Sequence, residues 1–326
     1  MAAMTTRSRS AHESSTRAGL AYGLAAFGFW GLVPIYFKAV SPVPALEVLA
    51  HRVVWSVVVL GVVLSLKRRW PEVAAALTDR KTLGVLALTT VLIGANWYIF
   101  IWAVNNDQVL QASLGYFINP LVNVFLGVVF LKERLSRAGI VAVAMAATGV
   151  GWLTVRGGEL PWISLVLAFS FGLYGLLRKT ARVKPVPGLM VETMLMLPAA
   201  LIYLAATASH GGLYFGTGSL ELDLLLVAAG LVTAIPLLWF TAAAQILPLS
   251  TMGFIQYLAP TLHFVLAVMV YGEPMTGERL TAFVFIWVAL AIFTIDQIRR
   301  QPTGSASGVD SGEDRMNSGI RLPGNP

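Results

Sequence analysis

Residues 113–135, SLGYFINPLVNVFLGVVFLKERL, recur in altered form as residues 251–275, TMGFIQYLAPTLHFVLAVMVYGEPM. Each copy has a Gly, then a Pro, then an apolar run that ends in Glu, and the spacing from Pro to Glu is the same in both. Similarity at a fixed offset is the mark of an internal repeat, and membrane transporters are often built from two such repeats. The stretch therefore favours a duplicated membrane protein.

Two earlier segments repeat at a similar offset. Gly28-Phe-Trp-Gly-Leu32 returns as Gly172-Leu-Tyr-Gly-Leu176, and Pro42-Val-Pro-Ala-Leu46 returns as Pro185-Val-Pro-Gly-Leu189. The duplication thus covers most of the chain, with a period of roughly 140 residues.

Composition places the chain in a lipid bilayer. Hydrophobic residues make up 57% of the 326 residues and charged residues 12%, and the mean hydropathy is +0.74. A soluble chain of this length could not bury so much apolar surface. The apolar runs are about 20 residues long and do not alternate, so they predict transmembrane helices and not a β-barrel. The predicted fold class is all-α integral membrane.

Ten apolar segments are long enough to span the bilayer, and the linkers between them are short. Five spans form a first repeat over residues 18–155 and five form a second over residues 156–298, with polar tails at 1–17 and 299–326. The first tail lacks a cleavage site and is predicted to be retained, and the second is predicted to be disordered. The ten predicted spans are 18–38, 46–66, 83–104, 109–131, 138–155, 160–178, 188–208, 222–242, 249–271 and 280–298.

The basic residues predict the orientation. If the N-terminus is cytoplasmic, nearly all Lys and Arg residues fall on the inside, and only Lys38, Arg156 and Arg279 lie outside. This matches the positive-inside rule, so both termini are expected in the cytoplasm and the membrane is expected to be the plasma (inner) membrane. The net charge of +7 then reflects basic loops facing an anionic leaflet, and no nucleic-acid partner is predicted.

Five spans is an odd number, so two such repeats enter the membrane from opposite sides. The sequence therefore predicts two inverted five-helix repeats around a central cavity, an architecture used for alternating access. Competing classes are a channel or lipid-moving protein, a sensor or regulatory scaffold, and a membrane enzyme. Four scattered histidines and the absence of cysteine and of a Walker A sequence argue against catalysis, thiolate metal sites and ATP-driven pumping. No cofactor or metal is predicted.

The chain resembles the drug/metabolite transporter superfamily, in its EamA family and RarD-like branch. The resemblance implies ten helices in two inverted repeats, with helices 1 to 4 and 6 to 9 around a cavity and helices 5 and 10 at the periphery. It does not imply one substrate, since relatives handle drugs, amino acids and other metabolites. The residues that carry it are Val43-Pro-Ala-Leu-Glu-Val-Leu-Ala-His-Arg52, Asn96-Trp-Tyr98, Ser113-Leu-Gly-Tyr-Phe-Ile-Asn-Pro-Leu121, Lys132-Glu-Arg134, Gln256-Tyr-Leu-Ala-Pro-Thr261 and Tyr271-Gly-Glu-Pro274.

The densest polar cluster within a span is Glu47, His51 and Arg52. The spacing of four residues places Glu47 and His51 on one helical face. Charged groups at bilayer depth are costly and usually face a cavity, so the cluster is a candidate for binding a cationic group or a proton, with Arg52 as an anion contact or counter-charge. The alternative is interfacial: Glu47 favours the helix N-terminus, and Arg52 snorkels or pairs with it.

Further candidates lie deeper in the membrane. His263 falls near mid-bilayer in span 9, and its counterpart in the first repeat is Asn123, so the two could form a site near the pseudo-twofold axis. The alternative for His263 is a buried histidine that a neighbouring helix satisfies. The remaining cavity candidates are Asn96, Trp97, Asn119 and Gln256, together with Glu192, which lies near the cytoplasmic face of span 7 and is either a gate or an interfacial residue.

Two acids end the repeated motifs. Glu133 and Glu273 are predicted to be structural, ending their helices or pairing across a loop. The resulting hypothesis is a secondary active transporter of a small organic solute, with proton coupling through Glu47 or His51 as a further hypothesis. The expected partners are the lipid bilayer and a small-molecule substrate. A homodimer and a non-transporting sensor stay open.

Overall fold

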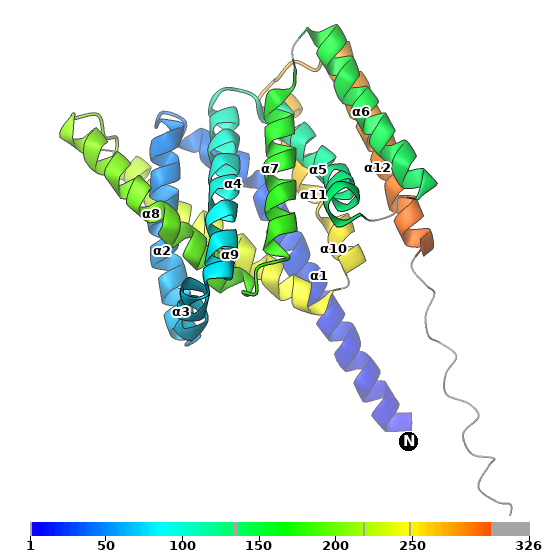
Figure 1. The fold of residues 1–326 in the computed structure, drawn as a ribbon, viewed down its shortest axis with the longest axis horizontal. Coiled ribbons are helices and arrows are strands. Elements are labelled where there is room, and N and C mark those ends of the chain that lie inside the picture. Colours follow the sequence, from blue (N-terminus) through cyan, green and yellow to red (C-terminus); the bar gives the residue numbers. More distant parts are fainter. Residues whose placement is uncertain (1, 133–135, 159, 218, 248, 301–326) are drawn as a thin grey trace, which may run out of the picture.

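The computed structural model is all-helical in the residues it describes, which are 2–132, 136–158, 160–217, 219–247 and 249–300 (Figure 1). These ranges contain helices and no strand. Glu133 and the predicted tail beyond residue 300 lie outside the described residues. The helices are α1 (Ala2–Ala39), α2 (Ala45–Leu66), α3 (Trp70–Thr78), α4 (Arg80–Asn105), α5 (Val109–Leu131), α6 (Arg137–Gly157), α7 (Trp162–Arg178), α8 (Pro185–Ser209), α9 (Leu220–Ile246), α10 (Leu249–Ile255), α11 (Leu258–Val265), the π-helical turn η1 (Leu266–Val270) and α12 (Gly277–Arg300).

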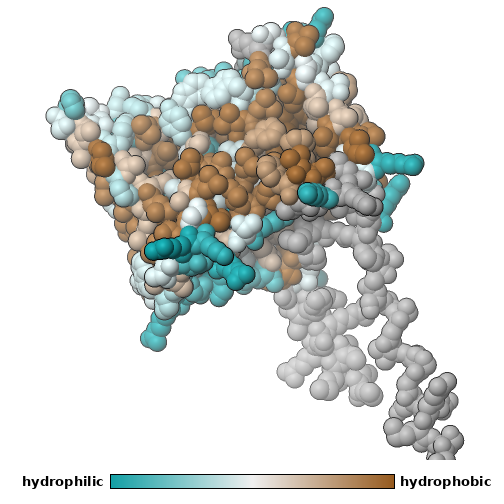
Figure 2. All heavy atoms as spheres, in the orientation of Figure 1, coloured by the Kyte–Doolittle hydropathy of each residue, from teal (hydrophilic) through white to brown (hydrophobic). Residues whose placement is uncertain are grey.

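Every predicted span coincides with a helical segment. Among the described residues, nine segments are long and apolar enough to cross a membrane, and a tenth, α7, is apolar but shorter, at 17 residues. Exposed side chains between the helix ends are largely apolar, as at Val91 and Ile202. Figure 2 shows this apolar surface in brown, with hydrophilic side chains gathered toward its edges. A multi-pass membrane protein follows from this surface.

The structure differs from the predicted elements at the start of α1 and in the linker 67–81. Helix α1 begins at Ala2, whereas the predicted span begins at residue 18 after a polar tail. The apolar part of α1 that could cross the membrane begins at Thr16, close to the predicted start. The basic linker 67–81 holds the short helix α3, which begins with Pro71 near its first position and buries Val73 and Ala76. Nine residues with one apolar face are too short to register as a span.

The two copies of the repeated motif fold differently around their prolines. Pro120 sits inside the continuous helix α5, whereas the second copy is divided into α10, α11 and η1. The division falls at Gln256 and Tyr257, just before Pro260. A proline has no N–H and its ring clashes with the carbonyl four residues earlier, here that of Gln256, so the break lies where the proline disturbs the helix.

Helix pairing gives the bundle its shape. Helix α1 packs against α9 and α11, α2 packs against α8 and α9, and α4 and α5 both pack against α7. Helices α6 and α12 pair mainly with each other and lie side by side at one edge, with α8 near the opposite edge (Figure 1). This agrees with the peripheral place expected for the fifth and tenth spans.

Close contact between α2 and α9 depends on Gly230. A Cβ atom at that position would lie 2.4 Å from the backbone oxygen of Trp55. Only glycine lets the two backbones approach so closely, which is a common way for membrane helices to pack. Because α2 and α9 belong to the two predicted repeats, this contact helps to fix how the halves meet.

Candidate functional site

Arg52 reaches the middle of the bundle from the second turn of α2. Its Nε donates a hydrogen bond of 2.8 Å to Thr233 Oγ1, and Thr233 lies at the middle of α9. Its guanidinium stacks over the Trp97 ring of α4 at 3.9 Å from the ring centroid and lies 5.8 Å from the Phe37 ring centroid of α1. The side chain therefore stands between three helices at bilayer depth, held by a hydrogen bond and a cation–π contact.

A second group of polar side chains surrounds Tyr116 of α5. Its hydroxyl donates to Asn96 Oδ1 at 3.3 Å, and its ring centroid lies 5.8 Å from that of His263. Asn96 in turn donates to the Leu167 carbonyl and to Ser170 Oγ, both on α7. Phe100 lies between the two groups, with its ring centroid 5.8 Å from that of Phe37 and 5.8 Å from that of Tyr116. We name Arg52, Trp97, Asn96, Tyr116 and His263 the central polar site.

His263 is buried and held by a distant backbone group. Its Nε2 lies 3.0 Å from the Trp30 carbonyl of α1, and its ring centroid lies 5.4 Å from that of Phe100. Its Nδ1 is buried without a partner among the described residues. A ring with one satisfied nitrogen and one free nitrogen can still take a hydrogen bond from a ligand or a water molecule. Both readings of His263 made from the sequence are thus compatible with its contacts.

Glu192 of α8 belongs to a separate cluster. Its carboxylate accepts hydrogen bonds from Thr89 Oγ1 at 2.6 Å and from Tyr174 at 3.3 Å, and it lies 3.7 Å from Arg178 Nε. The guanidinium of Arg178 lies over Gly188, where a Cβ atom would be 2.4 Å from its Nη atoms. This buried ion pair joins α4, α7 and α8 and stands apart from the central polar site.

Glu47 and His51 lie beneath the loop between α8 and α9. Glu47 Oε1 accepts hydrogen bonds from the backbone N–H groups of Tyr214 at 2.9 Å and Phe215 at 3.4 Å, and the His51 ring centroid lies 4.8 Å from that of Phe215. Glu47 Oε2 and His51 Nε2 are buried without partners in the described part of the chain. The two share one helical face, as the sequence predicts, and that face holds the loop in place.

The other candidates are not drawn into the central polar site. Asn119 is buried with its Oδ1 unpartnered among the described residues, and Gln256 lies half-buried at the break between α10 and α11. Asn123 is exposed, with its Oδ1 near Gly172 of α7. The structure therefore does not bring Asn123 together with His263, although the two occupy matching positions in the repeated motif.

Glu273 illustrates the structural role predicted for the acids that end the motifs. Its carboxylate accepts hydrogen bonds from the N–H groups of Val109 and Leu110 at 2.7 and 2.9 Å, and so caps the first turn of α5. Burial raises the pKa of the Glu273 carboxyl, and the two backbone donors oppose that rise. The residue thus joins the end of the second motif to the start of α5, the helix that carries the first motif.

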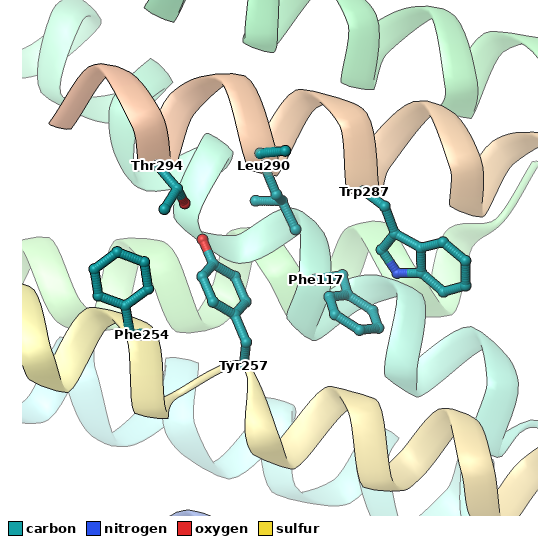
Figure 3. Close-up of a pocket in the computed structure, with 7 residues that line it drawn as sticks. Phe117, Phe254, Tyr257, Trp287, Leu290 and Thr294 are labelled. Atoms are coloured by element: carbon teal, nitrogen blue, oxygen red, sulfur yellow. The ribbon is translucent and has the colours of Figure 1, made fainter. Parts of the chain in front are cut away.

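A pocket of about 230 Å³ opens between α5, α10, α11 and α12, away from these clusters. Its lining is apolar except for Tyr257 and Thr294, and the Tyr257 hydroxyl points toward Thr294 (Figure 3). It contains none of the predicted site residues. The buried polar clusters described above therefore lie outside this pocket.

Sequence reasoning missed several residues that complete these sites. Tyr116 lies within the repeated motif, which is the only signal for it, and the sequence places Arg178 among the basic residues that set the topology. Thr233 sits in an unbroken apolar run and gives no signal at all. Their roles come from partners that are far away in the sequence.

Comparison with known proteins agrees with this architecture. Residues 17–155 match the EamA-like transporter family. Protein RarD of Escherichia coli (strain K12) is 50% identical over 286 residues, which cover 88% of this chain and 97% of that protein. The chain belongs to the EamA family. The resemblance and the all-helical drug/metabolite transporter fold expected from the sequence are confirmed.

Other EamA relatives point the same way. A protein of Vibrio cholerae named "Uncharacterized transporter" is 48% identical over 287 residues, covering 88% of this chain and 95% of that protein. "Chloramphenicol-sensitive protein RarD" of Pseudomonas aeruginosa is 33% identical over 288 residues, covering 86% and 95%. One crystal structure aligns over 87% of this chain and 99% of its own with a TM-score of 0.55 and 18% identity, a likeness of fold alone. The family description and the relative named as a transporter indicate a membrane transporter.

Proposed function

We propose that this protein is a secondary active transporter that moves a small organic solute across the plasma membrane by alternating access. The observation that carries the proposal is the position of the central polar site. Its hydrogen bonds join residues of the first half to residues of the second, from Arg52 to Thr233, from Asn96 to Ser170 and from His263 to Trp30. A solute bound there would touch both halves, and relative motion of the halves would expose it to either side.

The helix contacts support two inverted repeats, residues 18–155 and 156–298. If α1, α2, α4, α5 and α6 correspond to α7, α8, α9, α11 and α12, the contacts come in matching pairs. The contact of α1 with α9 matches that of α7 with α4, and the contact of α5 with α7 matches that of α11 with α1. Corresponding helices also contact each other, as α2 does α8, α5 does α11 and α6 does α12. A pseudo-twofold axis between the halves would produce this pattern, which therefore supports the proposed repeats.

The basic residues of the linkers support an orientation with both termini in the cytoplasm. The loop 67–81 carries an ion pair between Arg69 and Glu72 and lies at the same end of the bundle as the start of α8. Lys184, just before α8, lies 3.4 Å from Glu72. Basic linkers gathered at one end are what the positive-inside rule places in the cytoplasm.

Proton coupling through Glu47 or His51 is a separate hypothesis within the proposal. Each keeps one buried polar atom without a partner among the described residues, where a proton could bind or leave. Glu47→Gln and His51→Ala variants test it. If proton-driven flux is unchanged in both, the coupling lies elsewhere or does not exist.

Flux in proteoliposomes tests the proposed function. Purified protein is reconstituted and supplied with amino acids, amphiphilic drugs and nucleobase-like metabolites, each with and without a pH gradient. Accumulation of one class that needs the protein supports transport. A folded protein that carries nothing across this panel would instead support a sensor or scaffold, to be followed by a search for a protein partner.

A further inference from the structure

Arg52 places an uncompensated charge in the interior of the bundle. Arginine does not lose its proton in proteins, so its guanidinium carries a full positive charge. Across the described residues, no carboxylate lies within ion-pair distance of it. A charge at bilayer depth is costly unless it is paired or faces a water-filled cavity. A group that compensates the charge of Arg52 is therefore expected.

The buried acids of the described residues are all engaged elsewhere. Glu47 accepts hydrogen bonds from the backbone of the loop after α8, and Glu192 accepts them from Thr89 and Tyr174 beside Arg178. Glu273 caps the first turn of α5. A rearrangement of side chains therefore does not readily supply Arg52 with an internal counter-charge. The pairing with Glu47 considered from the sequence does not form.

The guanidinium also has donors to spare. Its Nε bonds to Thr233, whereas its Nη groups make no hydrogen bond to any described residue. The Nη atoms of Arg52 are not fully buried, whereas Nη1 of Arg178 is buried without a partner among the described residues. Arg52 is only half-buried, as are Trp97 and Tyr116 beside it. The fork of donors is thus accessible within the bundle.

The surroundings of this fork are flat and apolar. The Trp97 ring lies under the guanidinium, and Phe37 stands close to it. Phe100, Tyr116 and His263 form a contiguous set of rings nearby, with centroids 5.4 to 5.8 Å apart. Rings of this kind suit an apolar or aromatic body, while the planar donor fork of arginine matches a carboxylate.

We propose that Arg52 binds a carboxylate of the transported solute, and that the aromatic rings around it hold an apolar or aromatic body attached to that carboxylate. The inference rests on the proposed transport function and assigns it a substrate class, an organic anion. Trp97 holds the guanidinium from below and Thr233 fixes its Nε, so that the two Nη groups face the solute.

Binding of three matched probes tests the assignment. Indole-3-acetate, indole-3-acetamide and tryptamine share one ring and carry a negative, a neutral and a positive group. Isothermal titration calorimetry with the full chain in a neutral detergent is expected to give at least about tenfold tighter binding of the acid than of the amide. The wild-type comparison needs no variant, so it stands even if a variant fails to fold.

Two arginine variants give the matched comparison. Arg52→Gln is expected to reduce the preference for the acid over the amide to about one, and Arg52→Lys, which keeps the charge but loses the fork, to leave part of it. Arg156→Gln is the control, because Arg156 also stands over a tryptophan, Trp152, at 5.5 Å, but is exposed near the end of α6. It is expected to leave the preference unchanged.

Equal binding of acid and amide by the wild type, or preferred binding of tryptamine, overturns the assignment. So does a preference for the acid that survives Arg52→Gln. Stabilisation of the wild type by phosphatidylglycerol alone, lost in Arg52→Gln, would assign Arg52 to a lipid headgroup and also overturn it. These results leave flux of other solutes untouched, so they are distinct from a failure of transport, which shows as no flux across the broad panel.

Discussion

Replacing Gly230 with alanine is expected to push α2 and α9 apart at the level of the central polar site. The new Cβ would lie 2.4 Å from the Trp55 backbone oxygen and 2.5 Å from its carbonyl carbon, whereas ordinary contact begins at 3.4 Å. The obstacle is backbone, which cannot turn aside as a side chain can. The helices must therefore separate by up to about 1 Å, which costs about 1 to 3 kcal/mol of stability.

The same displacement reaches the site itself. Gly230 lies one turn before Thr233 on α9, and Trp55 lies one turn after Arg52 on α2. A hydrogen bond of 2.8 Å between Arg52 Nε and Thr233 does not survive a separation of this size. We therefore expect weaker binding of the carboxylate probe as well as lower stability.

Gly151→Ala is the matched control. Gly151 is also inside a transmembrane helix, α6, but a Cβ there would meet nothing within 4 Å. Its substitution should be neutral or gain up to about 1 kcal/mol, since alanine favours a helix more than glycine does. Thermal unfolding in detergent, followed by the fluorescence of the nine tryptophans, compares the two variants. Equal melting temperatures for Gly230→Ala and Gly151→Ala would refute the reasoning.

Three further changes test other contacts. Gly188→Ala should displace the guanidinium of Arg178, because the new Cβ would lie 2.4 Å from its Nη atoms. The double variant Gly188→Ala/Arg178→Gln should therefore lose less stability in thermal unfolding than the two single variants lose together. Glu273→Ala should leave two N–H groups of α5 without their acceptor and cost about 1 to 2 kcal/mol; an unchanged melting temperature would contradict the cap. The hydrogen bonds from Arg69 lower the pKa of Glu72 to about 2, so the carboxylate contributes stability at neutral pH that is lost as the pH falls from about 4.5 toward 2. Because Glu72 is partly exposed, Glu72→Gln should cost less than about 1 kcal/mol at pH 7, and the difference from wild type should shrink at pH 3.

Hydropathy and spacing predicted the helices well because each span is a local property of about 20 residues. Where the prediction departed from the structure, the feature was either shorter than such a span or dependent on packing around it. The helix α3 is too short to stand out, and the repeated prolines gave no sign that Pro120 would be held in a continuous helix while Pro260 would accompany a break. That difference depends on the helices packed around each copy.

The charged residues of the buried polar clusters could be picked out from the sequence, whereas their partners could not. Arg52 and Glu192 stand out because charges are rare in apolar runs. The sequence could not show that Glu47 faces backbone N–H groups 167 residues away, or that Thr233 receives the Arg52 hydrogen bond across 181 residues. Such pairs form only when the two halves meet, so no local pattern encodes them.

The contacts of Glu47 and Glu273 join residues far apart in the sequence, so neither contact can form until most of the chain has been synthesised. Glu47 is synthesised 167 residues before Tyr214, whose N–H group donates to it. Val109 and Leu110 of α5 are likewise synthesised long before Glu273, which accepts hydrogen bonds from their N–H groups. At ordinary translation rates this interval is roughly ten to thirty seconds. During it the first half is inserted but incomplete, with a carboxylate and a helix end that only later residues can satisfy. A nascent chain that stops after α6 would lack both contacts, so we expect it to be an assembly intermediate and not a stable protein.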